Sequence, residues 1–464
     1  MKKISFLTGS QFLYGEETLR QVEKDSLEMV NFLNDNLGGV EVVFGGVMTT
    51  SEKIEKAIKE INYDDETIGV MVWCHTFSPA KMWIKGLKIL NKPLLHLHTQ
   101  FNEKLPYATI DMDFMNLNQS AHGDRELAYI LTRMGIVRKS VVGYYKHESV
   151  LKEIRSWIAV VKGVDFSRNL KICRFGDNMR EVAVTDGDRV QAHIDFGWQT
   201  DYYAIGDIVT EINKVTDEEV DALYAEILEK YDLNTDNVAA VKEQVKYEIA
   251  LKRFFAAGNY KAFSTNFQDL YGLKQLFGMS AQRLMEQGYG FGAEGDWKIA
   301  AFCAIMKKMA EGREGATAFM EDYTYDLTEG QELVLESHML EVCPTLAGNK
   351  PKIEVHPLGI GGKEDPARLV FDGTTGDGIA VCMVDMGDCF RIICAHVELV
   401  KQPQPMPNLP VARVMWKLKP DFKNGAKAWL EAGGAHHTVV STSVTADEMR
   451  LFAEINGAEF VEIG

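Results

Sequence analysis

The sequence predicts an α/β chain in which parallel sheets come first and an antiparallel barrel or sandwich follows. Up to about residue 310, nearly continuously apolar strands alternate with helices, which is typical of parallel sheets covered on both faces. After about residue 316, short strands of alternating polarity follow one another across Gly, Asp and Pro turns. A length of 464 residues exceeds what one hydrophobic core usually supports, so we expect two or three domains.

The first alternating segment contains five predicted strands, with the sequences ISFLT, VEVVF, GVMVWC, PLLHLH and SVVGY. The intervening helices are expected at residues 17–34, 51–61, 77–90, 124–134 and 147–161. The last of these should stop before Gly163, which places a domain boundary close to residue 170.

A second alternating segment begins with the strand LKICRFG and continues with predicted helices at residues 217–231, 237–257 and 297–310. The later strands are ELVLESHML, ARLVF, IAVCMVDM, FRIICAHVELV and ARVMWKL. We therefore expect an N-terminal α/β domain at 1–170, a central α/β domain at 171–313 and a C-terminal antiparallel β domain at 314–464.

Composition excludes several classes of partner. The net charge of -17 repels phosphate backbones and anionic membranes, and no Lys/Arg block overcomes it locally, so we expect no nucleic acid partner. The N-terminal apolar run is too short for a signal peptide, and no stretch approaches the roughly 20 apolar residues of a membrane span. Seven scattered cysteines without a CxxC pair indicate reduced core thiols. The expected location is the cytoplasm.

The segment QGYGFGAEGDW contains a formal GxGxxG match at Gly290, Gly292 and Gly295. A dinucleotide fingerprint should follow a strand, whereas the helical stretch SAQRLMEQ precedes this one, so we expect no nucleotide cofactor. The glycines allow a tight turn that presents Glu294 into a cavity. The alternative is a solvated carboxylate in a surface turn.

Glu321 lies in TAFMEDYTYD, where an extended backbone places it on one face with Phe319, Tyr323 and Tyr325. A carboxylate on such a face needs a partner, because burying it unpaired is unfavourable. The alternative is an edge strand with that face half exposed. His338 ends or follows the strand ELVLES, where a lone histidine is usually a hydrogen-bonded core or rim residue.

His436 and His437 are adjacent and follow two glycines, which permits close backbone approach to a ligand. Neighbouring residues of a strand point to opposite faces, so one imidazole could bind a metal while the other faces substrate. A histidine pair in a loop is also often incidental. His96 and His98 share a strand face at a predicted sheet edge, where polar pocket lining is the simpler interpretation. Carboxylates and imidazoles of this kind suit Mn²⁺ or Co²⁺ better than a thiolate-rich zinc site.

Long motifs add a more specific indication. They are GSQFLYG (9–15), HTFSPAKMWI (75–84), DMDFMNLNQSAHGDRE (111–126), CRFGDNMREVAVTDGD (173–188), YGFGAEGDWK (289–298), FMEDYTY (319–325), SHMLEVCP (337–344), GIGGKEDPARL (359–369) and GGAHHT (433–438). Over nearly its whole length the chain resembles the L-arabinose isomerases. The resemblance implies two doubly wound parallel-sheet domains of the fucose isomerase-like kind followed by a C-terminal antiparallel β-barrel.

The resemblance also implies an enzyme of arabinose catabolism, an intramolecular oxidoreductase that converts L-arabinose to L-ribulose, and D-galactose to D-tagatose, through an enediol. Its metal ligands fall on Glu294, Glu321, His338 and His437, and the two glutamates form the acid/base pair. Manganese is the expected ion, with Co²⁺ or another divalent ion as alternatives.

The sugar pocket implied by the resemblance is lined by Gln11, Leu13, Gln119, His122, Met179, Phe267, Ile360 and His436. The counterpart of His122 reaches the site from a neighbouring subunit of a homohexamer, which places the active sites at subunit interfaces.

Two other function classes remain open on sequence grounds. A nicotinamide-dependent sugar oxidoreductase fits the parallel sheet and the glycine match, and a non-catalytic sugar-binding protein also fits paired α/β domains. The missing export signal and the four potential metal ligands argue against the binding protein.

Overall fold

The computed structural model describes residues 1–464 and divides into two compact units, Met1–Lys162 and Gly163–Gly464. Each unit is described by itself. None of the helices combines the length and apolarity that crossing a bilayer requires.

The first unit is built on a parallel five-stranded sheet in the order β2-β1-β3-β4-β5. Its strands are β1 (Lys3–Gly9), β2 (Glu41–Met48), β3 (Thr67–Cys74), β4 (Leu94–His98) and β5 (Arg138–Val142). Every residue of β3 is buried, as expected for a central strand covered on both faces. The strand order reverses between β1 and β3, and ligands of open α/β sheets bind at the carboxyl ends beside such a reversal.

The helices of this unit are η1 (Phe12–Tyr14), α1 (Gly15–Leu37), α2 (Ser51–Tyr63), η2 (Ala80–Trp83), α3 (Ile84–Leu87), α4 (Met112–Leu117) and α5 (Ser120–Arg133). Helix α6 (Glu148–Arg168) begins in this unit and ends in the second. Two predictions are wrong here. The helix expected at 77–90 is reduced to the short turns η2 and α3. Helix α6 does not stop before Gly163 but continues to Arg168, because a Cβ at that glycine would lie 2.6 Å from the Met309 side chain and only glycine permits this close packing.

The second unit begins with a parallel four-stranded sheet in the order β10-β9-β6-β7. These strands are β6 (Lys171–Phe175), β7 (Gln199–Tyr203), β9 (Ala262–Ser264) and β10 (Gly290–Gly292). The helices are η3 (Ala183–Thr185), α7 (Arg189–Phe196), α8 (Ile205–Ile212), α9 (Asp217–Lys230), α10 (Val238–Gly258), α11 (Met279–Glu286) and α12 (Trp297–Met309).

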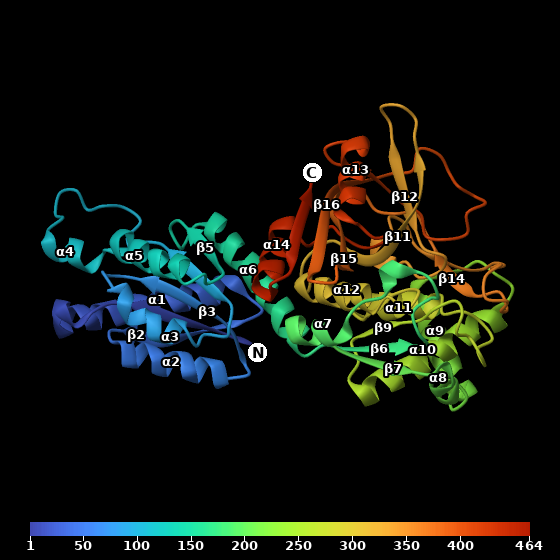
Figure 1. The fold of residues 1–464 in the computed structure, drawn as a ribbon, viewed down its shortest axis with the longest axis horizontal. Helices are drawn as coiled ribbons and strands as arrows, with labels where there is room; N and C mark the ends of the chain where they lie inside the picture. The colour runs from blue at the N-terminus through green and yellow to red at the C-terminus, as the bar shows by residue number, and fades with distance from the viewer. The chain divides into compact units, whose positions relative to one another are not determined.

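Helix α12 is buried on nearly all sides, from Trp297 to Met306 without interruption. A helix that is apolar all round must be enclosed by protein. It packs against β6, β9 and β10 on one side and against β11, β15 and β18 on the other. Figure 1 shows it between the parallel sheet and the later strands.

The later strands form a closed antiparallel barrel of the cyclic order β15-β18-β11-β12-β17-β16, closed by the pairing of β15 with β16. Its strands are β11 (Thr317–Asp326), β12 (Leu333–Ser337), β15 (Gly376–Asp385), β16 (Phe390–Val400), β17 (Val414–Leu418) and β18 (His437–Ser441). The strand β19 (Glu459–Ile463) adds to β16 in parallel. Helices η4 (Pro344–Leu346), α13 (Phe422–Ala432) and α14 (Ala446–Asn456) accompany the barrel, and Figure 1 shows α13 at one end of it. The predicted fold class is therefore confirmed.

One predicted barrel strand belongs elsewhere. The segment ARLVF forms β14 (Ala367–Val370), which pairs with β13 (Lys352–Val355) in a three-stranded sheet completed by β8 (Asp232–Leu233). The alternating polarity of this segment predicts a strand, but it does not predict which strand it pairs with. The division of the second unit at residues 313 and 314 stays a prediction.

Candidate functional site

Three neighbouring strands of the barrel bring three predicted site residues together. On β11, Glu321 lies opposite Ser337 of β12 on one side and opposite His437 of β18 on the other. His338 directly follows Ser337, and the ring centroids of His338 and His437 are 6.1 Å apart. The alternative that placed Glu321 on an edge strand is wrong, because β11 is paired on both sides.

Glu294 comes from the loop between β10 and α12. Its φ of 59° lies in the left-handed region, which is uncommon for a residue that carries a Cβ, and Gly295 follows with a φ of 82°. The backbone amide of Met179 donates to the Glu294 carbonyl at 2.9 Å. Such conformations persist only where the surroundings hold them, and they cluster at functional sites.

Each of the two glutamates faces at least one imidazole. Glu294 Oε2 lies 3.5 Å from His436 Nε2 and 3.8 Å from His437 Nε2, while Glu321 Oε2 lies 3.7 Å from His338 Nε2. One possible ligand atom from each of Glu294, His436 and His437 falls within 4.8 Å of the others. The carboxylates remain accessible, since the side chains of Glu294 and Glu321 are 14% and 20% exposed.

Buried carboxylates hold the outer nitrogens of two histidines. Glu341 Oε2 lies 2.5 Å from His338 Nδ1, and Asp296 Oδ2 lies 3.1 Å from His437 Nδ1. Both arrangements leave Nε2 for the site, as in the carboxylate–histidine–metal triads of metalloproteins. His437 Nε2 is buried and has no hydrogen-bond partner. The donor set therefore fits a divalent cation.

The electrostatics of the cluster favour an ionised Glu294. Burial acts to raise the pKa of this carboxyl, but the hydrogen bond with His436 and the nearby imidazoles outweigh it and lower the pKa. For His338, burial acts to lower the pKa of the imidazole, but the neighbouring Glu341 carboxylate outweighs it and the pKa is raised.

The expectation that His436 and His437 point to opposite faces is wrong. Both Nε2 atoms approach Glu294 Oε2, and the two ring centroids are 4.4 Å apart. Strand β18 begins at His437, so His436 lies outside the extended segment and the alternation of strand side chains does not apply to it.

Two predicted sugar-pocket residues of this unit lie at carboxyl ends of its parallel strands. Met179 follows β6 and contacts Glu294 through the backbone, as described above. Phe267 follows β9, and its ring stacks on His338 with centroids 5.9 Å apart and planes inclined by 15°. Ile360 is half-buried, and its neighbour Gly361 approaches the Phe267 carbonyl, because a Cβ there would lie 3.6 Å from that oxygen.

The remaining predicted pocket residues lie in the first unit, near the carboxyl edge of its sheet. Gln11 and Leu13 follow β1, and Leu13 is 83% exposed. The Tyr14 hydroxyl donates to Gln119 Oε1 at 3.0 Å, which joins this segment to the start of α5. His122 is exposed and stacks on Phe77, with ring centroids 4.4 Å apart.

The two strand histidines of the first unit bind a carboxylate instead of facing a ligand. His96 Nε2 and His98 Nδ1 lie 3.0 Å and 2.9 Å from the two oxygens of Asp124, which also accepts the Cys74 amide. Asp124 is 1% exposed, so this network joins β4 to α5 in the interior.

The GxGxxG match spans the strand β10 and the turn that follows it. Gly290 and Gly292 belong to β10, and a Cβ at Gly292 would lie 2.3 Å from the Asp296 carbonyl. These two glycines allow β10 to pack directly on α12, and Gly295 completes the turn that presents Glu294.

Sequence reasoning missed the residues that support the histidines. Asp296 caps α12 through the Ile299 amide while it holds His437, and the fully buried Lys298 lies 3.3 Å from it. A capping aspartate before an apolar helix is visible in the sequence, but its second partner 141 residues away is not. Beside the cluster, burial and the nearby carboxylates raise the pKa of Tyr323 to about 12, so its hydroxyl stays protonated and can donate a hydrogen bond.

Comparison with known proteins gives a consistent result over the whole chain. Residues 1–169, 171–312 and 316–459 match models of the N-terminal, central and C-terminal domains of L-arabinose isomerase. An L-arabinose isomerase 2 of Bacillus licheniformis and an L-arabinose isomerase of Oceanobacillus iheyensis are 53% and 52% identical, covering 100% of this chain and 98% of each relative. The L-arabinose isomerase of Bacillus subtilis is 52% identical over 99% of this chain and 93% of its own length.

The fold, the paired carboxylates and these matches make the protein an enzyme of the aldose–ketose isomerase class. The chain belongs to the L-arabinose isomerase family.

Proposed function

We propose that the protein converts L-arabinose to L-ribulose, and also D-galactose to D-tagatose. The observation that supports this most directly is the meeting of Glu294 and Glu321 with three imidazoles in a cluster that solvent can reach. The relatives at 52% to 53% identity carry the name of the first reaction.

A divalent cation fits this cluster, and Mn²⁺ is the proposed ion, with Co²⁺ as an alternative. Glu294, Glu321, His338 and His437 would hold it, with His436 facing the sugar. Oxygen and imidazole donors suit such ions, and the buried His437 Nε2 has no other partner. When bound, the ion supplies Lewis-acid polarisation of the sugar carbonyl.

The two glutamates form the proposed acid/base pair. Isomerisation of the open-chain aldose moves a hydrogen from C2 to C1 while the hydroxyl proton moves from O2 to O1. One glutamate removes the C2 proton, which gives an enediol, and returns it to C1; the other transfers the hydroxyl proton. The lowered pKa of Glu294 keeps that carboxylate ionised, as a base requires.

The sugar pocket extends the proposal to both units. Met179, Phe267 and Ile360 would contact the sugar from the unit that holds the glutamates. Gln11, Leu13, Gln119 and His122 would contact the sugar from the first unit, and His122 would reach the site from a neighbouring subunit of a homohexamer. The exposure of Leu13 and His122 leaves both side chains available for such a contact. The proposed location is the cytoplasm, and no nucleotide cofactor takes part.

The test uses Glu294→Gln and Glu321→Gln, with the exposed Glu329→Gln as the matched control. General acid/base groups contribute about 10²- to 10⁴-fold each, so each site variant should lose at least about 100-fold in kcat while the control stays near the parent. Calorimetric titration with Mn²⁺ shows whether a variant still binds the ion. A site variant that binds Mn²⁺ and turns over normally would refute the acid/base roles.

Metal dependence is tested separately by dialysis against a chelator. Activity should disappear and return on addition of Mn²⁺, whereas activity that survives the chelator contradicts a metal role. Absorbance of reduced nicotinamide during turnover distinguishes the oxidoreductase alternative, and we expect no change in that signal.

A further inference from the structure

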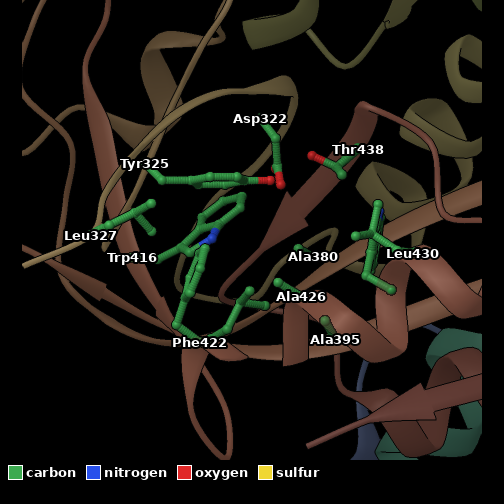
Figure 2. Close-up of a pocket in the computed structure, with 12 residues that line it drawn as sticks. Asp322, Tyr325, Leu327, Ala380, Ala395, Trp416, Phe422, Ala426, Leu430 and Thr438 are labelled. Atoms are coloured by element: carbon green, nitrogen blue, oxygen red, sulfur yellow. The ribbon is translucent and has the colours of Figure 1, made fainter. Parts of the chain in front are cut away.

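The β-barrel contains a cavity that the proposed reaction does not use. Its volume is about 220 Å³, and it lies between the inner face of the barrel and helix α13. Figure 2 shows its lining: Asp322 and Thr438 at one end, the rings of Tyr325, Trp416 and Phe422 along one side, and Leu430 opposite.

Strand register explains why this cavity is separate from the glutamate cluster. Glu321 and His437 face that cluster, so the next residues, Asp322 and Thr438, face the barrel interior. A bulge at Tyr323 interrupts the pairing of β11 with β12, and alternation then restarts one residue later. Tyr325 consequently lines the cavity together with Asp322. Regular alternation along the strand predicts that these two side chains lie on opposite faces, and that prediction is wrong because of the bulge.

Small side chains create the space. Ala380 on β15 and Ala395 on β16 line the cavity and are buried, at 3% and 0% exposure. Ala426 of α13 contributes a third small side chain from the opposite side. Large residues at these positions would fill the barrel, as they do in most small barrels.

The walls suit a flat ring. Tyr325 and Phe422 make an edge-to-face pair with ring centroids 4.9 Å apart and planes inclined by 69°. Trp416 is 1% exposed, yet its indole Nε1 has no hydrogen-bond partner. At the rim, Leu327 and Leu430 are 63% and 76% exposed, which leaves an apolar entrance.

The far end is polar. Asp322 Oδ1 and Glu336 Oε2 are both buried. Burial and the hydrogen bond with Asp322 raise the pKa of the Glu336 carboxyl, so a protonated Glu336 donates to the Asp322 carboxylate. The Thr438 hydroxyl donates to Glu336 Oε1 at 3.1 Å, so it is already occupied as a donor and can accept. The Asp322 carboxylate keeps further lone pairs, so a ligand hydroxyl at this end of the cavity can also donate to it.

We propose that the barrel cavity binds a small monocyclic phenol or ring-bearing alcohol, with its ring between Tyr325, Trp416 and Phe422 and its hydroxyl donated to Asp322. An apolar cavity of about 150 Å³ is large enough to bind benzene. The 220 Å³ found here accommodates one substituted ring. This site goes beyond the proposed isomerase reaction and does not depend on it.

The probe is 4-fluorophenol, with fluorobenzene as the matched compound that lacks the hydroxyl, both followed by fluorine NMR on the full-length chain. We expect saturable binding of 4-fluorophenol with a Kd on the order of 1 mM. Fluorobenzene should bind about three- to tenfold more weakly, because it cannot donate to Asp322. Equal affinities would overturn the assignment of the polar end.

The location is tested with Ala426→Phe, which fills the cavity from α13, and with Lys427→Phe as the control. Lys427 is 69% exposed on the same helix and does not line the cavity. Binding of 4-fluorophenol should be lost in the first variant and retained in the second. If Ala426→Phe does not fold, Ala426→Leu serves the same purpose with a smaller side chain. Absence of saturable binding to the parent protein, or equal binding to all variants, overturns the proposal.

Discussion

Asp296 Oδ2 lies 3.1 Å from His437 Nδ1, and both side chains are essentially inaccessible to solvent. The carboxylate fixes the orientation of the ring and leaves Nε2 directed at Glu294. Burial acts to raise the pKa of Asp296, but the neighbouring Lys298 and His437 prevail and lower it. A charged carboxylate is therefore held behind His437. It increases the basicity of the imidazole, which suits the proposed role of His437 as a metal ligand.

Replacing Asp296 by Asn should weaken Mn²⁺ binding by about 10- to 100-fold, the usual effect of removing an outer partner of a metal-binding histidine. Asn preserves the helix cap of α12, so the fold should be retained. The measurement is the Kd for Mn²⁺ by calorimetry on chelator-treated protein. Glu341 is the corresponding partner of His338, so Glu341→Gln should weaken Mn²⁺ binding by a similar factor. Unchanged affinity in both variants would show that neither carboxylate supports a metal ligand.

Trimming Phe267 to Ala should shift preference toward a six-carbon aldose. Its ring stacks on His338 and limits the space beside the proposed sugar site. D-Galactose carries one more carbon than L-arabinose, and one such group is worth about 10-fold or more in discrimination. The kcat/KM for D-galactose divided by the kcat/KM for L-arabinose should rise by about 10-fold. Phe267→Leu provides an intermediate size, and an unchanged ratio in both variants would remove this residue from the specificity argument.

Gly292→Ala should destabilise the protein by at least about 1–3 kcal/mol, the usual effect of overpacking. The new methyl group would meet the Asp296 carbonyl at 2.3 Å and the Ile299 side chain at 2.4 Å. The comparison is Gly206→Ala on α8, where nothing lies within 4 Å, and this change should raise stability by up to about 1 kcal/mol. Thermal unfolding of both variants checks the difference. Equal melting temperatures would contradict the close packing of β10 on α12.

His98 should stabilise the protein more at low pH than at high pH. Its hydrogen bond with Asp124 raises the pKa of the imidazole above the ordinary 6.5. The stabilisation is fully present below pH 6.5 and is lost as the pH rises through the higher folded-state pKa. The effect should be small, because the side chain is 32% exposed. The melting temperature of His98→Gln should fall furthest below the parent near pH 6 and approach it near pH 9, whereas a constant difference contradicts the pairing.

Much of the fold could be predicted because apolar periodicity survives in the sequence. The predicted helices at 217–231, 237–257 and 297–310 match α9, α10 and α12 within a residue or two at each end. Tertiary packing explains the failures. Gly163 reads as a helix end, yet it remains helical because Met309 packs against its bare Cα. The strand β14 was predicted, but its pairing with β13 depends on contacts that no local pattern encodes.

The candidate site was predictable only in part. Family motifs point to Glu294, Glu321, His338 and His437, and strand register brings the last three together. The bulge at Tyr323 could not be read from alternation, since one extra residue reverses every face that follows. The carboxylates behind the histidines are also invisible in the sequence, because each depends on the three-dimensional approach of a second chain segment.

Helix α12 serves two cores at once, since its buried residues pack on the parallel sheet and on the barrel. Neither layer can cover its apolar surface without this helix, so residues 163–464 should melt in one cooperative transition and not in two steps. The loop with Glu294 and the Asp296 cap directly precede the helix. Loss of the proposed catalytic arrangement on heating should therefore coincide with global unfolding of this unit.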